Sequence, residues 1–445
     1  MRESIKKYIG EHRDEIVETL KELVRIPSVR GEKEENAPFG RECAKVLERI
    51  RSLYAENGFE SILYKDGGYL LSYYGNGNKT LGMFAHADVV SVDDKWVFTK
   101  PFEPIEKDGF LIGRGVTDDK AGIVTALYCA KMLKELNIPF NSKLVMFVGA
   151  NEETGMRDIK NYVKENTPPD FSLVTDCAFP IFRGDKGILQ FEAVCETELL
   201  DVDCFFGGED INITLGEASA KIGDNIIAAE GISCHGALPK GSVNAGYLLA
   251  ERLLKEFKLC ENDKKIITFV SKLLKAYDGG VFGIENEDKT FGMLTCTNGV
   301  IKNRNGKLVI TFDIRYGTAV DYEKMKQKIN TFFIENGWTT QIISEKKPFL
   351  ISEDNSYLKK CLKAYSQITG TENPQTYINA GATHAGELSC AVETGTDLYC
   401  GKPEGMPEGH GNAHQPDECI NEKGFLDATE LILHMILECD TEHSN

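Results

Sequence analysis

Apolar residues recur every three or four positions in the first part of the chain and then form short continuous runs. The spacing over residues 4–26 predicts an amphipathic helix. A second helix is predicted to follow Pro38 and to stop at Gly58. The apolar runs 69–74 and 80–85 are typical of buried strands. The chain is therefore expected to begin with helices and then to enter a sheet.

Helical and strand-like segments alternate in the next part of the chain. Helices are predicted at 119–136 and 157–166, and strands at 143–150 and 172–175. Alternation of this kind predicts an α/β fold, with a largely parallel sheet flanked by helices on both faces.

The pattern changes between residues 187 and 346. The turn 303–306 reads Asn-Arg-Asn-Gly, which is a strong hairpin signal. These features predict a smaller α+β domain with an antiparallel sheet. Its expected strands are 187–195, 292–302 and 306–315, and its expected helices are 243–258, 264–276 and 321–336.

A long amphipathic helix is predicted again at 355–369, after which the chain returns to polar, motif-bearing segments. We therefore expect residues 1–186 and 347–445 to form one domain. Residues 187–346 are expected to form an inserted lid domain. No repeat or low-complexity tract interrupts this plan, and only the last six or so residues are expected to be frayed.

Composition excludes several classes of partner. The 445 residues carry a formal net charge of −18, which argues against binding to nucleic acid or to an anionic membrane surface. The N-terminus lacks the apolar core of a signal peptide, and no apolar run approaches the length of a membrane span. The 13 cysteines contain no C-x-x-C pair and are expected to be buried thiols in a reducing compartment. We expect a soluble, cytoplasmic protein.

Histidine and acidic motifs follow three of the predicted strands. His86 and Asp88 follow the run 80–85, Glu152 and Glu153 follow 143–150, and Asp176 follows 172–175. Ligands of parallel sheets bind beyond the carboxyl ends of the strands, so these motifs are expected to meet at one edge. Each motif alone is weak evidence, because solvated polar turns look similar.

The mixture of imidazoles and carboxylates suits a pair of Zn²⁺ or Mn²⁺ ions. Asp118, which follows two glycines, is expected to bridge the two ions. Of the adjacent pair, Glu153 is expected to be a ligand and Glu152 the general base. Asp88 is expected to accept the second ring N–H of the metal-bound imidazole of His86.

Further candidates lie outside these motifs. His235 precedes a helix in the insertion and could donate to a developing oxyanion. Arg315 could hold a substrate carboxylate with its guanidinium, and Asn298, Thr383 and His384 could add polar contacts. A structural role is the alternative for each of them, since an arginine on a strand is often a surface ion-pair residue.

In these residues and their order, the chain resembles the dinuclear zinc peptidases that include carboxypeptidase G, aminoacylase, carnosinase and the bacterial PepV-type (Xaa-His) dipeptidases. All of the metal motifs occur in the family's order, together with the His235 loop and the segment 312–316. The segments 36–40 and 216–220 and the length of the insertion favour the PepV-type branch.

The resemblance implies a zinc-exopeptidase-like catalytic domain and a ligand for each metal. His86, Asp118 and Asp176 would hold one ion, and Asp118, Glu153 and His414 the other. His410, in the same loop as His414, is the alternative ligand. The family also leads us to expect a cis peptide between Asp118 and Asp119.

The function implied is hydrolysis of dipeptides with a free N-terminus by water that the two metals activate. The alternatives are hydrolysis of N-acyl amino acids or carbamoyl compounds at the same site, or a non-catalytic binding protein. Zn²⁺ is the first choice of metal, with Mn²⁺ or Co²⁺ as alternatives. A monomer is favoured over a homodimer. His384 and Gly386 stand where PepV-type enzymes carry a tyrosine and a basic residue, and Lys120-Ala121-Gly122 replaces Lys-Gly-Pro, which puts the substrate preference in question.

Overall fold

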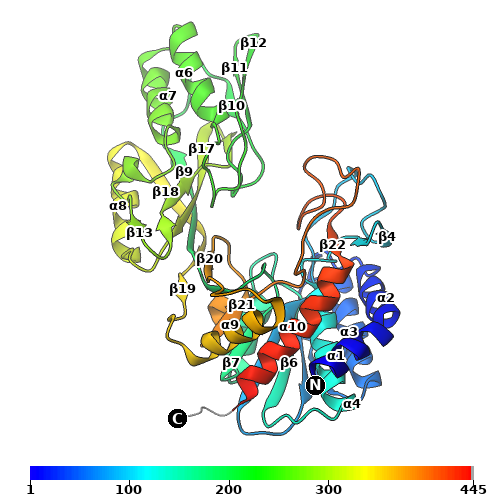
Figure 1. The fold of residues 1–445 in the computed structure, drawn as a ribbon. Helices are drawn as coiled ribbons and strands as arrows, with labels where there is room; N and C mark the ends of the chain where they lie inside the picture. The colour runs from blue at the N-terminus through cyan, green and yellow to red at the C-terminus, as the bar shows by residue number, and fades with distance from the viewer. Residues whose placement is uncertain (442–445) are drawn as a thin grey trace. The chain divides into compact units, whose positions relative to one another are not determined.

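The computed structural model describes residues 1–441, and its chain forms two compact units. Unit 1 comprises Met1–Gly184, Ile351–Asn379 and the chain from Thr383 onward. Unit 2 comprises Asp185–Leu350 and the short segment Ala380–Ala382. Figure 1 labels many of the helices and strands of both units.

The main sheet of unit 1 is parallel at its centre and antiparallel at its flanks. β3 pairs in parallel with β6 and with β7, and β21 pairs in parallel with β7. β1, β2 and β8 extend the sheet with antiparallel pairings. The strand order is β1-β2-β6-β3-β7-β21-β8, with β20 beside β8. The bounds are β1 Glu60–Tyr64, β2 Tyr69–Tyr74, β3 Thr80–His86, β6 Lys143–Gly149, β7 Phe171–Val174, β8 Phe182–Asp185, β20 Tyr377–Asn379 and β21 Ala391–Glu393.

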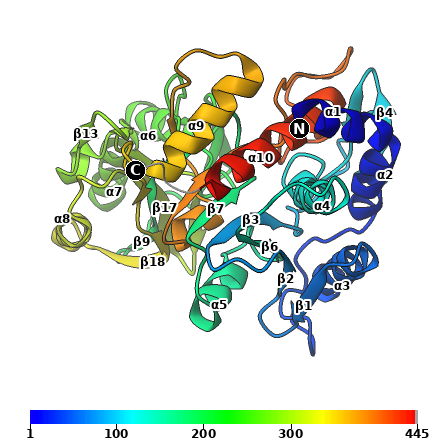
Figure 2. The ribbon, with the colours of Figure 1, turned by 60° about the horizontal axis from the view of Figure 1, so that its bottom comes forward.

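Helices flank this sheet, as expected. α4 and α10 pack against β3, and α5 packs against β2. Figure 2 shows α4 and α10 on one side of the sheet and α5 on the other. The helices of unit 1 are α1 Arg2–Glu11, α2 Arg13–Val24, α3 Arg41–Glu56, α4 Lys120–Glu135, α5 Arg157–Glu165, α9 Ser356–Thr369 and α10 Glu422–Asp440, with the short 3-10 helix η2 His384–Glu387.

The central strands are buried on both faces, which explains their continuous apolar runs. Phe84 of β3 stacks on Phe147 of β6, with ring centroids 4.9 Å apart. Tyr69 and Tyr162 surround the same ring of Phe147. A small antiparallel sheet completes unit 1, formed by β4 Ile105–Lys107, β5 Phe110–Ile112 and β22 Cys419–Asn421.

Unit 2 is built on an antiparallel sheet in the order β15-β17-β9-β18, with β16 also beside β17. Alternate residues of β9 are buried, the pattern of a sheet with one core face. Phe191, Phe312 and Phe333 form part of that core. The strands are β9 Gly187–Cys195, β10 Cys204–Phe206, β11 Glu217–Ile222, β12 Asn225–Glu230, β13 Glu287–Asp288, β14 Gly292–Met293, β15 Thr295–Thr297, β16 Ile301–Arg304, β17 Lys307–Tyr316, β18 Trp338–Lys346 and β19 Phe349–Leu350; the helices are α6 Ala245–Glu256, α7 Glu261–Leu274, α8 Tyr322–Glu335 and the 3-10 helix η1 Gly280–Phe282.

Two predicted elements were wrong in their extent. The helix over 4–26 is two helices that meet at His12, whose ring stacks on Tyr8 and whose backbone leaves helical geometry. The strand over 292–302 is divided among β14, β15 and β16. The predicted hairpin is confirmed, because Arg304 pairs with Lys307 across Asn305 and Gly306, and both of these turn residues have positive φ.

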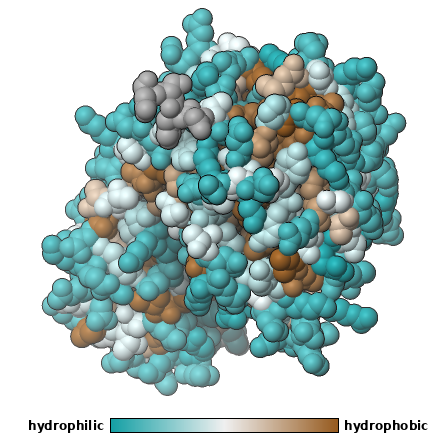
Figure 3. Space-filling view, turned by 90° about the horizontal axis from the view of Figure 1, so that it is seen from below, coloured by the Kyte–Doolittle hydropathy of each residue, from teal (hydrophilic) through white to brown (hydrophobic). Residues whose placement is uncertain are grey.

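Hydrophilic residues predominate on the face shown in Figure 3, and hydrophobic residues form several separate groups there. Within residues 1–441, no helix combines the length and the apolar character that a membrane crossing requires. All thirteen cysteines are free thiols.

Candidate metal centre

The carboxyl ends of three parallel strands bring the predicted motifs together. His86 was expected just after the strand, but it is the last residue of β3. It pairs with Gly149 at the end of β6. Asp176 follows β7, which pairs with the other side of β3. This common edge is where an α/β sheet places its ligands.

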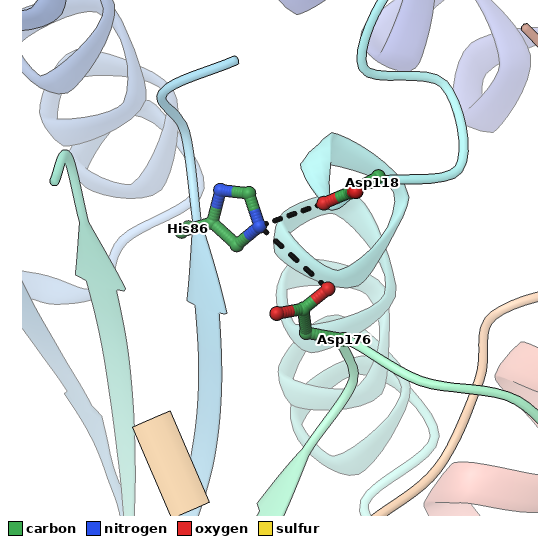
Figure 4. Close-up of side chains that lie close together, drawn as sticks. All are labelled: His86, Asp118 and Asp176. Carbon is green, nitrogen blue, oxygen red and sulfur yellow. Dashed lines mark hydrogen bonds and ion pairs between the residues drawn. The ribbon is translucent and has the colours of Figure 1, made fainter. Parts of the chain in front are cut away.

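The first group of donors consists of His86, Asp118 and Asp176 (Figure 4). Nε2 of His86 lies 2.9 Å from Oδ1 of Asp118 and 3.7 Å from Oδ1 of Asp176. His86 is fully buried, and both carboxylates are mostly buried. Three donor atoms therefore converge on one point.

The second group consists of Asp118, Glu153 and His414. Nε2 of His414 lies 3.0 Å from Oδ2 of Asp118 and 3.1 Å from Oε2 of Glu153. Asp118 thus offers a different oxygen to each group. The peptide from Asp118 to Asp119 is cis, as expected, and His414 has a φ of +66°. A left-handed histidine is uncommon and is often found at functional sites.

Both groups fit a divalent cation. Donor atoms about 2.0–2.2 Å from a tetrahedral zinc ion lie about 3.4 Å from one another, close to the separations above. Imidazole nitrogen and carboxylate oxygen are also the donors that Zn²⁺ and Mn²⁺ accept.

The electrostatics of the cluster point the same way. Burial and the charge of Asp118 raise the pKa of Glu153 to about 7. Burial and the charge of Asp118 also raise the pKa of Asp176. Burial would raise the pKa of Asp118 too, but hydrogen bonds from His414 and His86 lower it well below its ordinary value. Bound cations would stabilise all three carboxylates in their ionised form.

Asp88 has a different arrangement from the one expected. Nδ1 of His86 lies 2.9 Å from the backbone carbonyl oxygen of Asp88 and 3.5 Å from its carboxylate. The two carboxylate oxygens instead accept hydrogen bonds from the backbone N–H groups of Glu152 and Glu153, each at 3.1 Å. Asp88 therefore fixes the turn that carries both glutamates, while its carbonyl faces the imidazole.

Glu152 belongs to neither donor group. Its side chain is buried, and burial together with the nearby charge of Asp176 raises its pKa well above the ordinary value. A carboxylate of raised pKa at the edge of a metal site is suited to accept and return a proton.

Glu418 joins the two ends of the site, a role that the sequence analysis did not assign. Its Oε1 accepts backbone N–H groups of Gly115, Thr117 and Asp118, and its Oε2 accepts from Arg114 at 2.7 Å. Arg114 also donates to the carbonyl oxygen of His414. The acidic residues after His414 are visible in the sequence, but nothing in that segment indicates that Glu418 pairs with Arg114.

The residues next to Asp118 are fixed by other contacts. Nζ of Lys120 donates to the carbonyl oxygens of Leu23 and Ile26 and so caps the end of α2. Burial lowers the pKa of Lys120 to about 7. Asp119 accepts a hydrogen bond from the hydroxyl of Thr175 at 3.0 Å. These contacts hold the cis peptide between α2 and β7.

The alternative ligand His410 has another partner. Its Nδ1 lies 2.7 Å from Oδ2 of Asp417, whose carboxylate also accepts the backbone N–H groups of Val97 and Phe98. Only His414 of these two histidines belongs to a donor group.

Thr383 and His384 are both buried. The hydroxyl of Thr383 donates to Oε1 of Glu393 at 2.5 Å. His384 lies against the rings of His86 and Phe147, and its Nε2 is 3.4 Å from Oδ1 of Asp158. The structure therefore brings His384 close to the first donor group.

The candidates in unit 2 have contacts within that unit. Arg315 makes a two-pronged ion pair with Asp313, at 2.7 and 2.8 Å, and donates to the carbonyl of Ala380. The amide of Asn298 donates to the carbonyls of Val300 and Thr311. Nδ1 of His235 accepts the backbone N–H of Ala237 at 3.2 Å.

The sequence matches one family over most of its length. Residues 82–438 match the family described as peptidase family M20/M25/M40. A predicted dipeptidase of Staphylococcus aureus strain MRSA252 is 27% identical over 476 aligned positions, which cover 97% of this chain and 98% of that protein.

Solved structures share the fold at low identity. Human carnosine dipeptidase 1 superposes with a TM-score of 0.63 at 17% identity, covering 99% of this chain and 98% of that one. The di-peptidase Dug1p of Saccharomyces cerevisiae superposes with a TM-score of 0.62 at 14% identity, covering 100% and 99%. The expected family resemblance and fold class are confirmed.

Proposed function

Because the chain belongs to peptidase family M20/M25/M40 and is therefore a metallopeptidase, we propose that it hydrolyses dipeptides with a free N-terminus. The observation that carries this proposal is the pair of donor groups that share Asp118. The dipeptidase name of a relative that aligns over nearly the whole chain supports the substrate class.

In this proposal two divalent cations bind side by side. His86, Asp118 and Asp176 would hold one, and Asp118, Glu153 and His414 the other. Zn²⁺ is our first choice, since two imidazoles and three carboxylates suit it, with Mn²⁺ or Co²⁺ as alternatives. Bound there, the ions would polarise the scissile carbonyl and lower the pKa of water.

Glu152 is the general base of the proposed reaction. Asp88 fixes the backbone at Glu152 and at Glu153, so the two carboxylates leave the turn in set directions. Glu153 enters a donor group, and Glu152 stays available to take a proton from water and to pass it to the leaving amine.

Unit 2 is proposed to act as a lid that supplies substrate contacts. The backbone N–H of Ala237 donates to Nδ1 of His235, so the neutral imidazole carries its proton on Nε2 and can donate to an oxyanion. Arg315 keeps N–H groups beyond those used by Asp313 and Ala380, and these could hold a substrate carboxylate. Asn298, Thr383 and His384 complete the residues that we propose to take part in substrate recognition.

We further assign the protein to the cytoplasm as a monomer. The thirteen free thiols are consistent with a reducing compartment.

The proposal is tested by comparing matched substrates. Metal-loaded protein is given a panel of dipeptides and the same dipeptides with an acetylated N-terminus, and kcat/KM is measured for each. The free dipeptides should be cleaved faster. Faster cleavage of the acetylated forms would replace the proposal with an N-acyl amino acid hydrolase, and no cleavage of either set would favour a binding protein.

A further inference from the structure

A buried carboxylate and a buried histidine lie directly behind the turn that carries Glu152 and Glu153. Asp158 is fully buried near the start of α5, and His384 is 1% exposed at the start of η2. Resting on the function proposed above, we propose that Asp158 and His384 are a positioning pair that sets the direction of the two glutamates and holds the imidazole of His86.

The backbone of the turn shows what Asp158 does. Three consecutive N–H groups point at two carboxylates: Asn151 donates to Oδ2 of Asp158 at 2.7 Å, while Glu152 and Glu153 donate to Asp88. A peptide plane is rigid, so fixing three successive N–H groups fixes the path of the chain. Asp158 therefore supplies the first of three anchors, and Asp88 the other two.

The other carboxylate oxygen of Asp158, Oδ1, lies close to two further groups. Oδ1 accepts the backbone N–H of Ile159 at 2.8 Å and lies 3.4 Å from Nε2 of His384. One carboxylate thus connects the turn, the first residues of α5 and the segment of η2. The turn and α5 are neighbours in sequence, whereas η2 lies far along the chain, and the pair joins all three behind the metal groups.

Gly149 makes this arrangement sterically specific. A Cβ atom at Gly149 would lie 2.1 Å from Oδ2 of Asp158 and 2.9 Å from Cε1 of His384. Both side chains therefore pack onto the bare Cα of the last residue of β6. That residue pairs with His86 and accepts a hydrogen bond from the N–H of Ala87.

His384 completes the contact with the metal side. Its ring lies at 79° to the ring of His86, with centroids 6.3 Å apart, and edge-on to Phe147 at 5.4 Å. The ring of His384 thus lies between Phe147 of β6 and His86, a donor of the first group. Its burial explains why we assign it a positioning role in preference to direct contact with substrate.

An acidic residue in the first turn of a helix also stabilises that helix through its dipole. This simpler role predicts a loss of stability alone when Asp158 is changed. The positioning role predicts in addition that the side chains of Glu152 and Glu153 change orientation. As a result, kcat and metal affinity should fall while KM changes little. Replacing outer partners of metal ligands typically reduces metal affinity or activity by about 10–100-fold.

The test uses Asp158→Asn, His384→Phe and the double variant. Asp440→Asn is the matched control, because Asp440 is also a buried carboxylate. It accepts hydrogen bonds from the N–H of Asn141 and the hydroxyl of Ser142, which directly precede the start of β6, far from the metal groups. For each protein we would measure kcat and KM on a cleaved dipeptide, Co²⁺ affinity by titration, and the midpoint of thermal unfolding.

Asp158→Asn should lower kcat by about 10–100-fold with KM within about threefold, and should weaken Co²⁺ binding by about tenfold or more. The double variant should be little worse than Asp158→Asn, since the two residues act as a unit. Asp440→Asn should lose stability only. If Asp158→Asn matches the control in kcat and in Co²⁺ affinity, the positioning role is wrong.

Failure of the proposed function gives a different result. The wild-type protein would then cleave no dipeptide, and only the Co²⁺ titration would test the positioning role of Asp158 and His384. Weaker Co²⁺ binding by Asp158→Asn, with none in Asp440→Asn, would still support positioning.

Discussion

The carboxylate of Glu418 accepts a hydrogen bond from the backbone N–H of Asp118, at 3.2 Å and across 300 positions of sequence. The same side chain is paired with the buried guanidinium of Arg114. Glu418→Gln would keep the size of the side chain but leave that guanidinium without its counter-charge. We expect unit 1 to lose about 3–5 kcal/mol of unfolding free energy in urea titrations.

Glu438→Gln is the matched control for this prediction, because Glu438 pairs with the exposed Lys363. That exposed pair should contribute at most about 1 kcal/mol. Equal losses in the two variants would show that the buried pair of Arg114 and Glu418 contributes no more unfolding free energy than an exposed ion pair.

Glu152→Gln separates catalysis from metal binding. Glu152 lies outside both donor groups, so the variant should retain the metal content of the wild type. Loss of the proposed general base should lower kcat by a factor of about 10²–10⁴. Metal analysis and steady-state kinetics on one preparation check both points, and a variant that loses metal would contradict the assignment.

The two histidines of one loop should behave differently. His414→Ala removes a donor from the second group and should lower the number of tightly bound ions from the proposed two toward one. His410→Ala removes the partner of Asp417 and should reduce stability while the metal stays bound. Metal titrations of both variants make the comparison, and the reverse pattern would make His410 the ligand.

Gly122→Ala tests the packing of α4 against the site. Helix propensity alone predicts that Ala stabilises a helix by about 1 kcal/mol relative to Gly. A Cβ at Gly122 would, however, lie 2.0 Å from Oγ1 of Thr175 and 2.5 Å from Oδ1 of Asp119. We expect a net loss of about 1–3 kcal/mol in unfolding free energy.

Gly10→Ala provides the control, since Gly10 is also helical and nothing lies within 4 Å of its added Cβ. That variant should be neutral or more stable. The steric argument fails if both variants stabilise the protein.

Asp263 gives unit 2 a pH-dependent contribution to stability. Burial opposes its ionisation, but backbone N–H groups of Leu200, Val202 and Asp201 outweigh this and lower its pKa. The folded pKa lies below the unfolded value of about 3.9, so the contribution is present above that pH and is lost as pH falls through the folded pKa. Asp263→Asn should cost about 1–3 kcal/mol at pH 7.

The difference between wild type and Asp263→Asn should therefore shrink below pH of about 4, as measured by urea unfolding at several pH values. Asp224→Asn, at an exposed residue of the same unit, controls for the loss of one negative charge. A difference that is constant with pH would exclude the hydrogen-bonded carboxylate as its cause.

Strand ends were the part of the site that could be predicted from the sequence. The apolar runs before His86 and before Glu152 form parallel neighbours, and the geometry of a parallel sheet then places their ends together. Asp118 and His414 follow no strand of that sheet. Asp118 was predicted to bridge the two ions from its place after two glycines, whereas only the family resemblance made His414 a ligand. Their meeting depends on Glu418 and Arg114, whose partners lie too far away in sequence to be read from a local pattern.

Other features were missed for a similar reason. Asp158 lies in a predicted helix, where an acidic residue near the start is ordinary, and only the contact with His384 distinguishes it. The break at His12 follows from local backbone geometry in an otherwise continuous apolar pattern. Arg315 lies on the expected strand, but its pairing with Asp313 two residues earlier became evident only in three dimensions.

The late position of His414 in the chain bears on how the protein is synthesised. A nascent polypeptide that has emerged through Asp176 contains every donor except His414, and it also lacks the Glu418 that fastens Asp118. The second donor group can close only after translation has passed Glu418. Chains that stop before His414 would lack this donor group.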